Sequence, residues 1–257
     1  MTLALPADFL RLPIAHRALH DVTDGRPENS LAAIRAAIAA GYGIEIDLQL
    51  SADGHAMVFH DYNLERLAEG SGPINLLTRE QAQAIPLIGG DGEGIPDLAT
   101  VLDLVAGQVP LLIEVKDQDG QLGPDVGALE RAAAEALKGY SGLVALMSFN
   151  PNSVAELARL SPEVPRGIVT SAYDLASWPE LTGPICDRLR EMPDLDRVGA
   201  SFISHEASDL SRPLVRQTRD TGLLILCWTV QSEAEERAAR AFADNVTFEG
   251  YLSPLPG

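Results

Sequence analysis

Short apolar runs alternate with alanine-rich amphipathic stretches along the whole chain. Eight apolar runs have the length of strands and end in polar residues, at 12–17, 43–50, 109–116, 143–150, 166–170, 198–204, 223–230 and 245–251. Five helical stretches lie between most of them, at 30–40, 126–138, 151–160, 212–221 and 232–243. Strands that alternate with helices predict parallel pairing and an α/β class. Eight such units in 257 residues predict a (β/α)8 barrel, the TIM-barrel fold.

One connection in this pattern is too short for a parallel crossover. The run at 43–50 is followed by Ser51-Ala52-Asp53-Gly54 and then by another apolar run at 56–59. A parallel crossover needs about a dozen residues or more, and Asp-Gly between two β-type runs is a hairpin signal. We therefore predict that 56–61 folds back antiparallel on the second strand. The hairpin would bring His60 and Asp61 close to Glu45 and Asp47.

The segment 62–97 is rich in glycine and turn residues and is long for a loop. We interpret it as a small insertion or lid over one end of the barrel, with a short helix near 78–84. No linker, low-complexity segment or strong repeat divides the chain. The sequence therefore predicts a single barrel domain over 1–257.

The charge balance excludes several classes of partner. The chain carries 37 acidic and 19 basic side chains, a formal net charge of −18. This argues against a nucleic-acid partner, which requires a basic face, and against docking on anionic membranes. An acidic chain can still bind an anionic substrate where a metal ion supplies local positive charge.

The sequence shows neither a transmembrane run nor a secretory signal, and it contains few cysteines. No apolar run approaches the roughly 18 residues of a transmembrane helix, and the N-terminus lacks the pattern of a secretory signal. Cys186 and Cys227 are too few for a disulfide framework, and we expect both to be reduced. The sequence therefore predicts a cytoplasmic location without stable membrane insertion.

Three carboxylates are predicted at the carboxyl ends of two barrel strands. Glu45 and Asp47 stand two positions apart and so share one face of a strand, and Glu114 and Lys116 repeat this spacing. Polar residues at these strand ends are the usual catalytic positions of a barrel. Three converging carboxylates suit a hard divalent ion such as Mg²⁺ or Ca²⁺. The alternative is that they face solvent or pair with arginines.

Basic side chains are predicted around the same carboxylates. His16 and Arg17 end the first predicted strand, and the hairpin brings His60 nearby. His16 could be a general acid or base, or a hydrogen-bonded structural histidine. Two histidines beside a metal cluster, with Arg17 and Lys116, form a coherent set for phosphoryl chemistry. The cations would bind the phosphate while the histidines move protons.

Other candidate residues carry less information. His20, His55 and His205 lack a matching partner in the sequence. Trp228 ends the seventh predicted strand and is either core packing or a pocket wall. HExxH, G-x-G-x-x-G, P-loop and G-x-S-x-G motifs are absent, which argues against zinc proteases, nucleotide-binding folds and α/β-hydrolases.

The order of these residues resembles the glycerophosphodiester phosphodiesterase family. The resemblance covers nearly the whole chain and rests on Ala15-His16-Arg17, Pro27-Glu28-Asn29-Ser30, Ile44-Glu45-Ile46-Asp47, Ser51-Ala52-Asp53-Gly54, Val58-Phe59-His60-Asp61, Ile113-Glu114-Val115-Lys116 and Trp228-Thr229-Val230. It implies a (β/α)8 barrel with a small insertion after the His-Asp motif. It also implies a small-molecule substrate, a glycerophosphodiester, hydrolysed to sn-glycerol 3-phosphate and an alcohol with a divalent metal ion.

The resemblance also implies a role for each matching residue. The implied metal ligands are Glu45, Asp47 and Glu114, and the implied acid–base pair is His16 and His60. The implied substrate-binding and phosphate-binding residues are Arg17, Lys116, Glu28 and Trp228.

The chain departs from the family pattern in two notable places. Ala18 follows the His-Arg pair where the family usually has glycine, and Glu249 stands near the aspartate of the usual Thr-Asp-x-Pro motif. Neither change removes an implied ligand or acid–base group. Two further hypotheses are a phospholipase-type barrel that forms a cyclic phosphate and a barrel that binds without catalysis.

Overall fold

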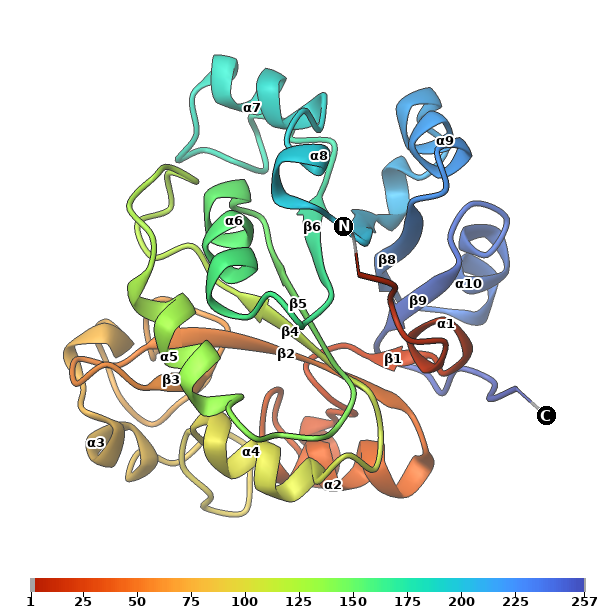
Figure 1. Cartoon of the computed structure of the whole chain (residues 1–257). Coiled ribbons are helices and arrows are strands. Elements are labelled where there is room, and N and C mark those ends of the chain that lie inside the picture. The colour runs from red at the N-terminus through yellow and green to blue at the C-terminus, as the bar shows by residue number, and fades with distance from the viewer. Residues whose placement is uncertain (1–2, 257) are drawn as a thin grey trace.

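Eight parallel strands form a closed barrel in the computed structural model, which describes residues 3–256 (Figure 1). The strands are β1 (Ile14–Ala15), β2 (Gly43–Leu50), β4 (Leu111–Val115), β5 (Val144–Ser148), β6 (Arg166–Thr170), β7 (Phe202–Glu206), β8 (Leu224–Val230) and β9 (Asn245–Phe248). Because β1 pairs in parallel with both β2 and β9, the sheet closes on itself. The predicted TIM-barrel fold is confirmed.

Helices surround the strands (Figure 1). They are α1 (Asp8–Arg11), α2 (Leu31–Ala40), α4 (Leu98–Val105), α5 (Ala128–Ala136), α6 (Pro151–Leu160), α7 (Gly183–Arg190), α8 (Leu195–Val198), α9 (Pro213–Asp220) and α10 (Glu233–Ala239). The five predicted helices are present, three of them starting at side-chain caps from Ser30, Asn150 and Ser232. The sequence pattern missed α1, α4, α7 and α8.

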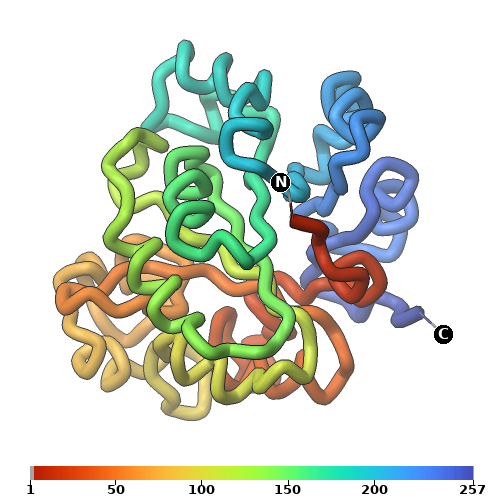
Figure 2. Tube along the Cα trace, viewed as in Figure 1, coloured from red at the N-terminus to blue at the C-terminus, as the bar shows by residue number. Residues whose placement is uncertain are grey.

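The barrel interior is closed at its amino end by the N-terminal segment. Phe9 of α1 is fully buried among strand residues that include Ile14, Leu112 and Phe202. Its carbonyl accepts a hydrogen bond from Asn245 Nδ2 at 2.8 Å, which ties the first helix to β9. Figure 2 shows this red N-terminal turn beside the blue C-terminal strand region. The opposite, carboxyl end of the barrel is therefore the end that can receive a ligand.

The predicted hairpin is present. β3 (Ala56–Val58) pairs antiparallel with β2, with Leu48 opposite Val58 and Leu50 opposite Ala56. The Phe59 N–H donates to the Asp47 carbonyl at 3.0 Å, so the antiparallel pairing continues one residue beyond β3, as far as Asp47. This pairing places His60 in the same pocket as Glu45 and Asp47 of β2.

The predicted insertion at 62–97 lies against the hairpin, around α3 (Arg79–Gln83) (Figure 1). Thr78 and Gln81 form a capping box at the start of this helix, which confirms the predicted short helix. The insertion has its own apolar cluster, in which Leu64, Ile74 and Leu87 pack with Met57 and Phe59 of the hairpin.

Left-handed backbone positions explain the wrong boundaries of three predicted strands. The first ends at Ala15 because Arg17 and Ala18 adopt φ of 50° and 65°. The run at 198–204 forms strand only from Phe202, because α8 ends before Gly199 at φ 61°. The last ends at Phe248, two residues before Gly250 at φ 78°. Such positions interrupt a strand ladder.

Candidate active site

A pocket at the carboxyl ends of the strands gathers the predicted site residues. Its wall contains His16, Arg17, Glu45, Asp47, His60, Glu114, Lys116 and Trp228. Glu28 is the one predicted residue outside this wall. It lies behind Arg17 and accepts a hydrogen bond from its guanidinium at 2.7 Å.

The three carboxylates converge because of the strand register. Asp47 of β2 is paired with Glu114 of β4, and Glu45 lies two residues earlier on the same face. Glu45, Asp47 and Glu114 are only 2%, 1% and 7% exposed, so the alternative that they face solvent is wrong. The alternative of pairing with arginines holds in part, because Arg17 Nε lies 3.5 Å from Asp47. A lysine also contacts the cluster, with Lys116 Nζ 2.9 Å from Glu114 and 3.3 Å from Asp47.

Burial and neighbouring charges shift the pKa values of Glu45 and Asp47 in opposite directions. Burial raises the pKa of Glu45 well above its ordinary value, and the charges of Asp47 and Glu114 raise it further. Burial would also raise the pKa of Asp47, but nearby positive charges, Lys116 foremost, hold it well below its ordinary value. Burial lowers the pKa of Lys116, but Glu114 and Asp47 outweigh it and raise that pKa overall.

A hard divalent cation fits this cluster. One oxygen from each of Glu45, Asp47 and Glu114 lies within 4.8 Å of the others, and carboxylate oxygens are the donors that Mg²⁺ and Ca²⁺ prefer. Among the described residues, only two basic side chains, Lys116 and Arg17, pair with these three carboxylates, and Arg17 is shared with Glu28, so negative charge is in excess. A bound divalent ion would supply the missing positive charge.

Each histidine of the pocket is hydrogen-bonded to a carboxylate through Nδ1. His16 Nδ1 lies 2.6 Å from Glu249, and His60 Nδ1 lies 2.7 Å from Asp61. An ionised carboxylate can only accept, so each pair places the proton on Nδ1 and leaves Nε2 free. Burial lowers the pKa of His16 more than its hydrogen bond to Glu249 raises it. The Glu249 position, where the chain departs from the family pattern, therefore directly contacts His16.

A guanidinium that sequence analysis missed joins two parts of the site. Arg66, in the insertion, donates to both carboxylate oxygens of Asp61 at 2.7 Å. It also donates to both oxygens of Glu28 at 2.9 and 3.0 Å. Arg66 thereby links the Asp61–His60 pair to the Glu28–Arg17 pair. Only a three-dimensional contact reveals this, because the segment around Arg66 carries no motif.

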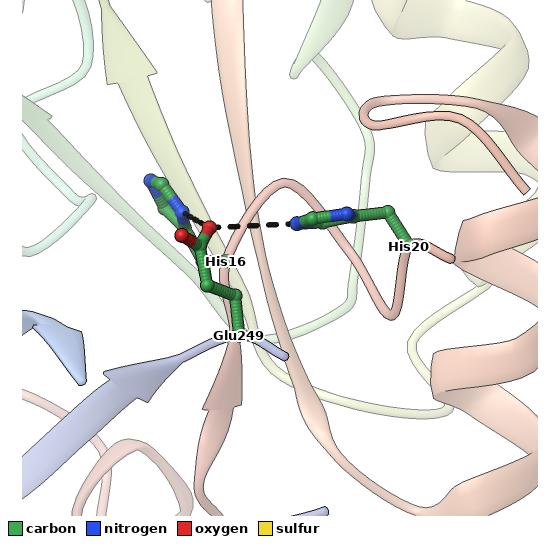
Figure 3. Close-up of side chains that lie close together, drawn as sticks. All are labelled: His16, His20 and Glu249. Carbon is green, nitrogen blue, oxygen red and sulfur yellow. Dashed lines mark hydrogen bonds and ion pairs between the residues drawn. The ribbon is translucent and has the colours of Figure 1, made fainter. Parts of the chain in front are cut away.

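His20, for which the sequence offered no matching partner, has Glu249 as a close neighbour but makes no hydrogen bond to it within the described residues. Its Nε2 lies 3.4 Å from Glu249 Oε2, the oxygen that also binds His16 (Figure 3). His205, in contrast, has hydrogen-bond partners, Thr170 and Asp209, and is fully buried. The His20–Glu249 and His205–Thr170 contacts each join residues that are far apart in the sequence.

Aromatic side chains form one wall of the pocket. Trp228 donates from Nε1 to the Ser204 carbonyl at 3.0 Å and is partly exposed. Its ring lies edge-to-face with Phe149 at 5.5 Å, and Phe149 also contacts Trp178. Both Trp228 and Phe149 line the pocket. Of the two alternatives for Trp228, core packing or a pocket wall, the structure shows the pocket wall.

Neither cysteine forms a disulfide. Cys186 and Cys227 are both free and buried. Among residues 3–256, the structure contains no helix with the length and apolar character needed to cross a membrane.

Comparisons with known proteins converge on one family. The model of the glycerophosphoryl diester phosphodiesterase family matches residues 16–247. The chain is 27% identical to a glycerophosphodiester phosphodiesterase of Caldanaerobacter subterraneus, over 91% of this chain and 92% of that protein. It is 26% identical to a Bacillus subtilis glycerophosphodiester phosphodiesterase, over 87% and 78%. Its fold is similar to an Oleispira antarctica phosphodiesterase in complex with the product sn-glycerol-3-phosphate, with a TM-score of 0.73, 25% identity and 93% of each chain covered.

Proposed function

The chain belongs to the glycerophosphoryl diester phosphodiesterase family and is a phosphodiesterase, and we propose that it hydrolyses glycerophosphodiesters to sn-glycerol 3-phosphate and an alcohol. One observation carries this proposal. The buried carboxylates Glu45, Asp47 and Glu114 share one pocket with two histidines, His16 and His60, each oriented by its own carboxylate. The product named for the Oleispira antarctica phosphodiesterase supports the same substrate class.

We propose that Glu45, Asp47 and Glu114 hold a divalent ion, Mg²⁺ or Ca²⁺. When bound, the ion supplies Lewis-acid stabilisation of negative charge on the phosphate. Arg17 and Lys116 line the same pocket and would neutralise the remaining phosphate oxygens. Glu28 fixes the Arg17 guanidinium and is oriented by Arg66, which supports a role at the edge of the glycerol subsite.

The two histidines divide the proton transfers. The lowered pKa of His16 favours its neutral form near pH 7, so its free Nε2 would accept the proton of the attacking hydroxyl. Glu249 would then stabilise the imidazolium that forms at His16. In its doubly protonated form, His60 would donate the Nε2 proton to the departing alcohol oxygen, with Asp61 holding the ring in place and stabilising its positive charge. The aromatic wall of Trp228 and Phe149 would line the side of the pocket next to the leaving alcohol.

The proposal also covers the domain organisation and the cellular location of the protein. We propose that 1–257 is one barrel domain, because the insertion packs on the hairpin rather than standing apart. We further propose a cytoplasmic location, supported by the two buried free thiols, which a reducing compartment preserves.

The test is release of glycerol 3-phosphate from glycerophosphocholine and glycerophosphoethanolamine. We expect release to stop with EDTA and to return with Mg²⁺ or Ca²⁺. His16→Ala and His60→Ala should each lower kcat by about 10²–10⁴-fold with the fold intact, because each removes one proton-transfer group. His55→Ala is the matched control, since His55 lies in the exposed hairpin turn.

Two outcomes would contradict this proposal. Release that persists at full rate in EDTA would argue against the metal role of the carboxylates. A cyclic phosphate accumulating in the phosphorus NMR spectrum would assign the reaction to the phospholipase-type mechanism instead.

A further inference from the structure

A second cluster of potential metal ligands lies beside the pocket, away from the three carboxylates. It consists of His16 and His20, from the segment after β1, and Glu249, directly after β9. Figure 3 shows the nitrogens of both imidazole rings turned toward the same carboxylate. Glu249 Oε2 lies 2.6 Å from His16 Nδ1 and 3.4 Å from His20 Nε2. One donor atom from each of the three residues lies within 4.8 Å of the others.

His20 has no role in the proposed reaction, yet its ring nitrogen is directed at this cluster. Within the described residues, the buried Nε2 atom of His20 makes no hydrogen bond. Its closest acidic atom is Glu249 Oε2, at a distance longer than a good hydrogen bond. A buried imidazole nitrogen without a hydrogen-bond partner is a free ligand atom.

The cluster borders a second groove in addition to the substrate pocket. His16 lines the catalytic pocket, whereas His20 and Glu249 line a separate groove with Ala18, Arg26 and other residues. The three ligands therefore lie on the wall between the two cavities. An ion could reach them through the groove without crossing the substrate pocket.

The donor set differs in chemistry from the first cluster. Two imidazole nitrogens and one carboxylate suit Zn²⁺ and similar transition-metal ions, whereas an all-carboxylate set suits Mg²⁺ or Ca²⁺. Tetrahedral Zn²⁺ bonds of roughly 2.0–2.2 Å place donor atoms roughly 3.4 Å apart. The His20–Glu249 distance of 3.4 Å already matches, and the His16–Glu249 distance of 2.6 Å would have to widen.

We propose that His16, His20 and Glu249 form a binding site for a divalent transition-metal ion of the zinc type, with water as the fourth ligand. The ion would bond to the lone pair of His16 Nδ1, and the proton now on Nδ1 would move by way of solvent to Nε2, so that the ring stays neutral. A His16 ring protonated on Nε2 can no longer accept a proton from a nucleophile. Zinc bound at this site would thus inhibit the enzyme. This consequence rests on the proposed role of His16, but the binding itself does not.

Binding is tested directly with Zn²⁺ alone as the probe. Wild-type protein saturated with Mg²⁺ is titrated with Zn²⁺ by calorimetry, and we expect one site. The double variant Glu45→Gln/Asp47→Asn, which disrupts the carboxylate cluster, should keep this site. His20→Gln should weaken binding at least tenfold, because it removes a ligand. His55→Gln, a change of the same kind in an exposed turn, should leave binding unchanged.

The absorption spectrum of bound Co²⁺ tests the ligands independently of turnover. Co²⁺ in place of Zn²⁺ should give the visible absorption of a four-coordinate site in the wild type and lose it in His20→Gln. Glu249→Gln is a second ligand variant and should lose it as well. Far-ultraviolet circular dichroism of each variant shows that the barrel is intact. In the activity assay, His20→Gln should need at least tenfold more Zn²⁺ for half inhibition than the wild type.

The proposal is overturned if the wild type binds no Zn²⁺ in the presence of Mg²⁺. It is also overturned if His20→Gln binds Zn²⁺ as tightly as the wild type, or if binding disappears only in Glu45→Gln/Asp47→Asn. Zinc binding that depends on His20 but leaves turnover unchanged would support the site and contradict the proposed base role of His16. The two proposals can therefore fail separately.

Discussion

At the scale of single residues, the chemistry of the pocket depends on which atoms the carboxylates leave free. The same functional group serves two purposes only a few ångströms apart. Glu45, Asp47 and Glu114 converge on one another and create a need for positive charge. Asp61 and Glu249 instead bind one histidine each and fix its tautomer. Changing Asp61 should therefore affect turnover without removing a ligand of the Glu45, Asp47 and Glu114 cluster.

Asp61→Asn tests this division of roles. The amide cannot hold His60 in one tautomer and cannot stabilise its protonated form, so we expect kcat to fall by about 10²–10⁴-fold. KM should change by only a few-fold, because phosphate binding uses other residues. The measurement is steady-state hydrolysis of glycerophosphocholine. Asp53→Asn, the same change in the exposed hairpin turn, is the control. An unchanged kcat in Asp61→Asn would remove His60 from the mechanism.

The sequence predicted these residues to the extent that their contacts follow from local geometry. The i, i+2 spacing placed Glu45 and Asp47 on one face, and the hairpin argument brought His60 to them. The contacts of His20 and Arg66 were missed because each bridges segments that only the closed fold brings together. Glu249 was noted only as a departure from a motif, and its contact with His16 depends on the β1–β9 pairing.

At the scale of elements, the insertion contributes to the site through a single guanidinium. Arg66 makes bidentate contacts with both Asp61 and Glu28, and so fastens the segment after the hairpin to the segment before α2. Burial would raise the pKa of Asp61 and of Glu28, but Arg66 and other positive charges outweigh it and lower both. The insertion is thereby coupled electrostatically to the barrel.

Arg66→Met should therefore destabilise the protein in a pH-dependent way. Arg66 is half exposed, so we expect a loss of only about 1 kcal/mol of unfolding free energy near pH 7. Groups whose native pKa is lowered stabilise the fold above their ordinary pKa and lose this effect as the pH falls through the native value. The difference in unfolding free energy between variant and wild type should thus be constant from about pH 5 to 8 and become smaller below about pH 4.

Urea denaturation at neutral and at acidic pH measures this difference. Arg159→Met is the matched control, because Arg159 makes only an exposed contact with Glu156 within one helix. Its effect should be smaller than that of Arg66→Met. A stability loss in Arg66→Met that is equal at both pH values would show that packing, not charge, is responsible.

At the scale of the whole molecule, barrel closure explains both the success and the limits of the sequence prediction. Alternation of strands and helices identified all eight parallel strands, because each is a buried apolar run between turns. The helices α7 and α8 were missed because they belong to a long excursion between β6 and β7. That excursion has its own apolar cluster, with Leu181, Cys186 and Leu189 packed on Tyr173.

The two cysteines report separately on this excursion and on the barrel. Cys186 lies in the α7 cluster, whereas Cys227 lies on β8 in the main core, where burial raises the pKa of its thiol to about 12. At pH 8 only about one in 10⁴ Cys227 thiols would be ionised in the native state, so its modification requires unfolding. A peripheral segment can open locally at lower cost than a closed barrel.

We therefore expect sequential labelling by a thiol reagent as urea is raised at pH 8. Cys186 should react first, below the main transition, and Cys227 should react only along with loss of the far-ultraviolet circular dichroism signal. Peptide mapping by mass spectrometry assigns each modified thiol, and Cys186→Ser removes the early phase. Cys227 labelling that precedes the loss of secondary structure would contradict a single cooperative barrel, because β8 is hydrogen-bonded to β7 and β9 on its two sides.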